Sequence, residues 1–118
     1  MNKISTILTI LVSAATPYLF CLDDATAQTT HGPTVVSVVF PPDVARPCAF
    51  FQLQGVPQAD PVAPGQPWFA IPMTNVGYHE QFALVLTAAF NNRPIVVATT
   101  GQADCGFAQV SSLYSQFP

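Results

Sequence analysis

Basic residues are almost absent from this chain. Of its 118 residues, only three are lysine or arginine, and 8% carry a charge of either sign. After Lys3 the only basic residues are Arg46 and Arg93, so no cluster of cations is present to displace counterions from a nucleic-acid backbone. The same scarcity argues against electrostatic attachment to anionic lipid. We therefore expect neither nucleic acid nor a charged membrane surface as a partner.

The composition is not that of a disordered protein. Half of the residues are hydrophobic, whereas a disordered chain combines low hydrophobicity with high charge. A chain of this length corresponds to one small domain, whose limited core favours some additional crosslink.

The first 27 residues have the pattern of a secretory signal peptide. Lys3 supplies the positive start, residues 4–22 are mostly apolar, and Ala25-Thr26-Ala27 has the small-x-small pattern that signal peptidase recognises. We predict cleavage after Ala27, which gives a secreted or periplasmic chain that begins at Gln28 and has no membrane span.

Two other interpretations of this segment are less favoured. A transmembrane helix is disfavoured because the apolar run barely reaches about 18 residues and Pro17 interrupts it. A lipid anchor on Cys21 is disfavoured because the bulky Phe20 precedes it, where lipoprotein processing requires a small residue.

Cysteine is scarce, and its number becomes even after cleavage. Cys21 leaves with the signal peptide, so Cys48 and Cys105 remain. An oxidising compartment favours a disulfide between them, worth about 4 kcal/mol for a loop of this span. The chain has no CxxC motif and no cysteine–histidine cluster at zinc spacing, so we predict no metal and no cofactor.

Short segments rich in β-branched and aromatic residues predict five strands. Within the second, Ala49, Phe51 and Leu53 alternate with Gln52 and Gln54, which is typical of a half-buried antiparallel strand. The expected strands are 34–40, 48–55, 67–72, 95–99 and 106–114. Residues 28–33 are a polar lead-in outside the sheet, residues 56–66 a proline-stiffened loop, and residues 100–104 a turn.

One segment changes to helical periodicity. Asn75 is expected as the N-cap, Glu80 suits the positive end of the helix dipole, and Asn91-Asn92 with Pro94 ends the helix. The apolar positions fall on one helix face and predict its buried side: Tyr78, Phe82, Val85, Leu86 and Ala89.

The predicted order is therefore β-β-β-α-β-β. We predict a mainly β domain with one helix over residues 28–118, built as an OB-fold-like five-stranded barrel whose helix closes one end. The alternative is an open α+β antiparallel sheet with one packed helix, because both arrangements bury the same helix face.

No residue pattern supports catalysis. His79-Glu80 does not extend to HExxH, because position 83 is alanine, and both side chains are expected on the solvated helix face. Ser111, His79 and Asp104 supply the residue types of a triad, but no G-x-S-x-G turn accompanies them. We predict that the protein is not an enzyme.

Trp68-Phe69 is the most informative pair for binding. An exposed aromatic ring can stack on a sugar, with Gln52 and Gln54 as hydrogen-bonding neighbours. The alternative is that these rings belong to the core. Because adjacent residues of a strand point to opposite faces, we expect one of the two rings to be outward.

Three stretches of the chain together resemble a known family. FQLQG (51–55) is followed by Trp68, and then by GYHEQFALVLTAAFNNRPIVVATTG (77–101), a cysteine and a last strand. Residues 34–114 thus resemble the B subunits of subtilase-type bacterial toxins, with RPIVVATTG (93–101) matching the helix-to-strand turn of that family. The resemblance implies a secreted OB-fold subunit, pentameric assembly and binding of host-cell glycans through a hydroxyl residue, which Thr34 matches here.

Two functions of different class remain open. The first is a secreted, non-catalytic binding module, oligomeric like toxin B subunits, that recognises a glycan or a host-surface receptor through Thr34, Gln52, Gln54, Trp68 and Phe69. The second is a periplasmic structural or accessory protein without a small-molecule ligand. A surface with so little charge must expose apolar and amide side chains, which favours self-association or partner binding.

Overall fold

The computed structural model describes residues 28–116. The predicted signal peptide and its cleavage point lie outside the described residues. Across residues 28–116, no helix is both long enough and apolar enough to span a membrane.

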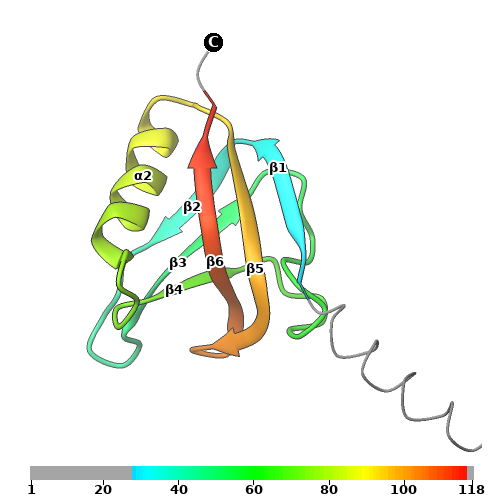
Figure 1. Ribbon diagram of the computed structural model, residues 1–118, viewed down its shortest axis with the longest axis vertical. Helices are drawn as coiled ribbons and strands as arrows, with labels where there is room; N and C mark the ends of the chain where they lie inside the picture. The colour runs from blue at the N-terminus through cyan, green and yellow to red at the C-terminus, as the bar shows by residue number, and fades with distance from the viewer. Residues whose placement is uncertain (1–27, 117–118) are drawn as a thin grey trace, which may run out of the picture.

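The domain is mainly β with a single helix, as predicted (Figure 1). The helix lies between the fourth and fifth strands. Its bounds and those of the six strands are β1 Thr30–Thr34, β2 Val36–Phe40, β3 Cys48–Leu53, β4 Phe69–Pro72, α2 Tyr78–Phe90, β5 Ile95–Asp104 and β6 Phe107–Ser115.

The strands form one mixed sheet in the order β1-β5-β6-β4-β3-β2. β4 and β6 run parallel, and every other neighbouring pair is antiparallel. The alternative of an open sheet with one packed helix therefore agrees with the pairing, except that the sheet is mixed rather than antiparallel. Figure 1 shows β3 and β4 crossing behind β5 and β6. β1 and β2 are the two ends of this order, although only Val35 separates them in the chain. The predicted closed five-stranded barrel is not confirmed by this pairing.

β1 is the main departure from the prediction. The polar lead-in is not outside the sheet, because Thr30 pairs with Ala98 and His31 with Val97 of β5. Gly32 has a φ of +110°, and a Cβ there would overlap the carbonyl oxygen of Ile95. Polar contacts and a close backbone approach, rather than apolar side chains, hold this strand in the sheet. It therefore has no apolar periodicity from which it could be predicted.

Side-chain hydrogen bonds connect β1 and β5 to the proline-rich loop. Asp60 is fully buried, where its carboxylate accepts a hydrogen bond from the Thr99 hydroxyl and another from the Val62 N–H at 2.9 Å. Thr29 Oγ1 donates to the Ala59 carbonyl at 2.8 Å, and His31 Nε2 lies 2.8 Å from the same oxygen. A buried carboxylate is tolerated only when it is hydrogen-bonded, and this network satisfies Asp60.

β5 is longer than predicted. It continues to Asp104, so residues 100–104 are strand rather than turn, with a shift of register opposite β6 between Thr99 and Ala103. The turn comes one step later, at Cys105-Gly106, where both residues have positive φ. β5 lies between β1 and β6 in the sheet, and Ile95 to Val97 are buried.

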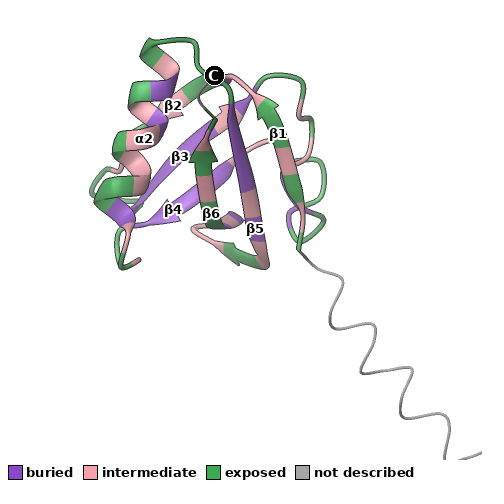
Figure 2. Cartoon of the chain, turned by 45° about the horizontal axis from the view of Figure 1, so that its top comes forward, coloured by how far each residue is buried: buried purple, intermediate pink, exposed green. Residues whose placement is uncertain are grey.

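The main core lies between α2 and one face of the sheet (Figure 2). Phe51 and Phe69 stack at its centre with ring centroids 5.1 Å apart. From α2, Tyr78 and Val85 are buried, Phe82 and Ala89 pack against the core, and His79 is exposed, as the helical periodicity predicts. Leu86 was expected on this face but is only partly buried outside the core, whereas Ala88 is buried in it. Burial raises the pKa of the Tyr78 hydroxyl above its ordinary value of 10.0.

The start of α2 differs from the prediction, and its end agrees. Gly77 is the N-cap, without a side-chain cap, and Asn75 instead accepts the Tyr78 N–H through its backbone oxygen at 3.2 Å. Asn92 has a φ of +54°, which is the left-handed helix ending expected there.

Candidate functional site

A second apolar cluster lies on the face of the sheet opposite the main core. Cys48, Phe50 and Ala70 are buried there, and Trp68, Cys105 and Phe107 pack against them. The alternation along β3 produces both clusters. Ala49, Phe51 and Leu53 share one face, as predicted, and pack into the main core with α2. The other face is also buried at Cys48 and Phe50, so the expected half-buried strand is corrected.

Four aromatic rings and one guanidinium surround a hollow of about 110 Å³ on this outer face, which we call the aromatic hollow. Its lining residues are Phe40, Arg46, Phe50, Trp68 and Phe107. Phe50 is the floor and is only 3% exposed. Its ring centroid lies 5.5 Å from that of Phe107 and 6.3 Å from that of Trp68, and both pairs meet edge-on, an arrangement favoured by the ring quadrupoles.

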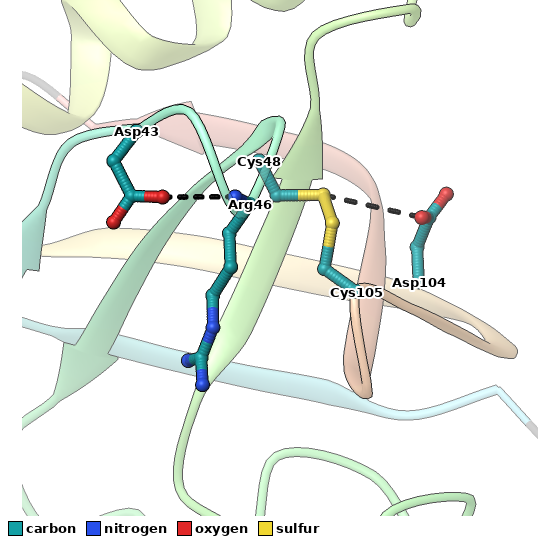
Figure 3. The surroundings of a disulfide bond; sticks show 5 residues. All are labelled: Asp43, Arg46, Cys48, Asp104 and Cys105. Carbon is teal, nitrogen blue, oxygen red and sulfur yellow. Dashed lines mark hydrogen bonds between the residues drawn. A yellow bond between two sulfur atoms is a disulfide. The ribbon is translucent and has the colours of Figure 1, made fainter.

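Arg46 is the one cation of the hollow. Its guanidinium carbon lies 6.0 Å from the centroid of the Phe50 ring, at the limit of a cation–π contact. Asp43 Oδ1 shapes the loop by accepting the backbone N–H groups of Ala45 and Arg46 at 2.9 and 2.8 Å. Figure 3 shows the guanidinium pointing away from that carboxylate. Arg46 therefore brings hydrogen-bond donors to an otherwise apolar surface.

The predicted disulfide is confirmed, and it lies beside the aromatic hollow. Cys48 and Cys105 are joined, with Cα atoms 6.5 Å apart (Figure 3). Arg46 precedes Cys48 by two residues, and Phe107 follows Cys105 by two. The bond thus connects two chain segments that each carry a lining residue of the hollow.

The same pair forms part of the one possible metal-binding group among residues 28–116. The donor atoms of Cys48, Asp104 and Cys105 lie within 4.8 Å of one another. The two sulfurs are bonded to each other, so neither is a thiolate, which is the form that binds a metal. Asp104 Oδ1 lies 3.9 Å from Cys48 Sγ as a contact only, because a disulfide sulfur has no proton to donate.

The structure separates the predicted aromatic pair. Trp68 is partly exposed and lines the aromatic hollow, whereas Phe69 is fully buried between Phe51 and His31. Phe69 therefore offers no surface to a ligand, and its inclusion among the ligand-binding candidates is corrected. The expectation that the two rings point to opposite faces is confirmed.

The predicted polar residues lie together, but outside the aromatic hollow. Gln52 and Gln54 line a shallow groove at the end of β3, and Thr34 Oγ1 donates to the Gln54 carbonyl at 2.9 Å. We call it the glutamine groove, and its lining residues are Ser37, Gln52, Leu53, Gln54, Gly55, Val56 and Pro57.

Four residues of the aromatic hollow were not predicted: Phe40, Arg46, Phe50 and Phe107. The signal for Phe50 was present, because it alternates with the core residues Ala49 and Phe51 and must therefore point away from α2. Phe107 is distant in sequence, and only the parallel pairing of β4 with β6 brings it near Trp68, which directly precedes β4.

The three residues that could supply a hydrolase triad, His79, Ser111 and Asp104, each contact other groups. The His79 ring packs edge-on against Tyr78 on α2, and Ser111 Oγ on β6 donates to the Ala98 carbonyl at 3.2 Å. Asp104 lies beside the disulfide at the end of β5.

Comparison with known proteins identifies no relative. No family model, no curated protein and no solved structure matches this chain. The resemblance to toxin B subunits stays a prediction from the sequence, and the function is argued from the site.

Proposed function

We propose that this protein is a secreted, non-catalytic binding module that holds a neutral sugar in the aromatic hollow. The observation that carries the proposal is the set of four aromatic rings beside one guanidinium. A pyranose ring has an apolar C–H face and a rim of hydroxyl groups. The Trp68 ring suits the apolar face, and the donors of Arg46 suit the hydroxyl oxygens.

We further propose that β1 and β2 act as one bent strand that curls the sheet into an OB-fold-like barrel. Val35 alone separates them, and they pair with β5 and β3 at the two ends of the sheet. The parallel pairing of β4 with β6 and the place of α2 between β4 and β5 also support this arrangement.

In such a barrel, β3 and β4 would be the second and third strands. OB-folds bind oligosaccharides and oligonucleotides on that face, helped by the loops after the first and fourth strands. Arg46 lies in the first of these loops, and Phe107 directly follows the second. In that arrangement the aromatic hollow would occupy the position that OB-folds use for ligands, which supports the proposal.

A sugar is favoured over single-stranded nucleic acid. Nucleic-acid grooves combine stacking rings with a row of cations along the phosphates. Arg46 is the only cation lining the aromatic hollow, and the sequence from Gln28 onward has two basic residues against four acidic ones.

Assembly into a ring would compensate for weak binding at each site. Sugars offer small contact areas and polar groups that lose water, so affinity per site is low, and several sites on one face supply avidity. Exposed apolar residues support self-association, among them Met73 at 50% exposure and the fully exposed Val76. The pentamer implied by the toxin resemblance and a host-surface glycan as partner belong to this proposal.

The test is a glycan array probed with the mature chain and with Trp68→Ala. Trp68 is the only tryptophan of the chain, so its fluorescence reports directly on the aromatic hollow. We expect a neutral glycan to bind and to change this fluorescence, and Trp68→Ala to abolish binding. Tyr114→Ala is the matched control, because it removes a half-exposed ring that does not line the hollow. Absence of glycan binding, or equal binding by Trp68→Ala, would favour the accessory protein without a ligand.

A further inference from the structure

We infer that the ligand is an oligosaccharide that extends along β3 from the aromatic hollow into the glutamine groove, rather than a single sugar. The inference rests on the proposed function and concerns the length of the ligand. It assigns the glutamine groove as a second subsite, with Gln52 and Gln54 as residues that select for chain length.

The two sites are neighbours on one face of the sheet. Phe50, the floor of the hollow, and Gln52, in the groove, are two residues apart on β3 and so point to the same side, about 7 Å from each other. Phe51 pairs with Phe69 at the start of β4, and continuing this register by one residue brings the preceding Trp68 across from Gln52. The exposed part of Trp68 thus lies beside the boundary between hollow and groove.

The amides of the groove are free to bind a ligand. Among residues 28–116, neither the Gln52 nor the Gln54 side chain makes a hydrogen bond, although their backbone carbonyls accept from Ser37 and Thr34. Two other glutamines do have protein partners, since Gln58 Oε1 accepts from the Gly65 N–H and Gln109 Oε1 from Thr100. An amide has two donors and an acceptor, which matches a hydroxyl that both donates and accepts.

The rest of the groove favours a neutral sugar chain over a peptide strand. Its remaining walls are small or apolar, and a Cβ on Gly55 would meet nothing within 4 Å, so the space above it is open. A peptide that adds to a sheet needs an exposed strand edge with unpaired backbone groups. β3 has none to offer, because it is paired with β2 on one side and β4 on the other.

The experiment measures binding of a series of oligosaccharides of one to four units, drawn from the glycan that binds on the array, by titration of Trp68 fluorescence. We expect affinity to rise about tenfold from the monosaccharide to the longer members, since two hydrogen bonds of ordinary net strength give a factor of this order. The double variant Gln52→Ala/Gln54→Ala should lose this rise and bind the monosaccharide as before. Gln102→Ala, an exposed glutamine on β5 outside both sites, is the matched control.

The outcomes separate this inference from the function on which it rests. Equal affinity for one and four units, or an undiminished rise in the double variant, would overturn the second subsite and leave sugar binding in the aromatic hollow intact. If no member of the series binds, or if Trp68→Ala binds on the glycan array as the wild type does, the proposed function fails and the subsite fails with it. Circular dichroism of each variant shows whether it is folded.

Discussion

The ring of Phe107 meets the ring of Phe50 edge-on, with centroids 5.5 Å apart. Each ring is two residues along the chain from a cysteine of the disulfide, Phe50 from Cys48 and Phe107 from Cys105. The disulfide therefore links the chain segments that carry Phe50, the floor of the aromatic hollow, and Phe107, another of its lining residues. We therefore expect the same bond to affect both the stability of the fold and the proposed ligand binding.

The first prediction concerns that bond. Replacing both cysteines, Cys48→Ser/Cys105→Ser, should lower the free energy of unfolding by about 4 kcal/mol, because the bridge spans 57 positions and restricts the unfolded chain. It should also weaken glycan binding, since the turn before Phe107 is released from β3. Urea titration measures the first effect and Trp68 fluorescence the second.

Reduction of the wild type by a dithiol should reproduce both effects, and the same dithiol should leave the double variant unchanged. If the untreated mature protein reacts with an alkylating agent at both cysteines, the bridge is absent in solution and this prediction is wrong.

The second prediction tests the core with two identical substitutions. Phe51→Ala should cost about 3–5 kcal/mol, because the ring is fully buried and stacked on Phe69. Phe90→Ala should change stability by less than about 0.5 kcal/mol, because the ring is 88% exposed at the end of α2. Urea titration of both variants supplies the comparison. If Phe90→Ala lowers the free energy of unfolding by clearly more than about 0.5 kcal/mol, the ring is covered in solution by another copy of the chain.

The sequence predicted those parts of the fold that depend on apolar periodicity. The alternation of Phe51 and Leu53 with their neighbours and the helical spacing of Tyr78, Phe82 and Val85 identified the main core, because burial of apolar surface is the largest stabilising term. β1 was missed because His31 and its neighbours are polar, and their partners come from distant parts of the chain.

The candidate site was predicted in part for the same reason. Trp68 was identified from its own chemistry, but its neighbours in the aromatic hollow come from separate segments. Phe40 ends β2 and Phe107 begins β6, and no local pattern indicates that these strands lie on either side of β3 and β4. Phe69 was indistinguishable from Trp68 as a ligand residue until the face of each was known.

The third prediction concerns the buried Asp60. Thr99→Val keeps the shape of the side chain but removes the hydroxyl that donates to the carboxylate, so it should cost about 1–3 kcal/mol. The loop 56–66 should also open more often, and limited proteolysis should cleave it faster than in the wild type. Thr87→Val on α2 is the control, because the Thr87 hydroxyl donates only to the Ala83 carbonyl at an exposed position. Equal stability and equal cleavage of the two variants would show that the network does not hold the loop.

The last prediction is a loss of stability in alkaline solution. Burial raises the pKa of Tyr78 in the folded state above 10.0, so the folded protein holds this proton more tightly than the unfolded chain does. The resulting contribution of Tyr78 to the stability of the folded state is fully present below pH 10. It is lost as the pH rises through the higher pKa that Tyr78 has in the folded protein. Urea midpoints measured from pH 8 upward should therefore fall above pH 10. In Tyr78→Phe, which keeps the ring against Phe82 at the stacked contact, the fall should be smaller, and an identical fall in both proteins would assign it to other groups.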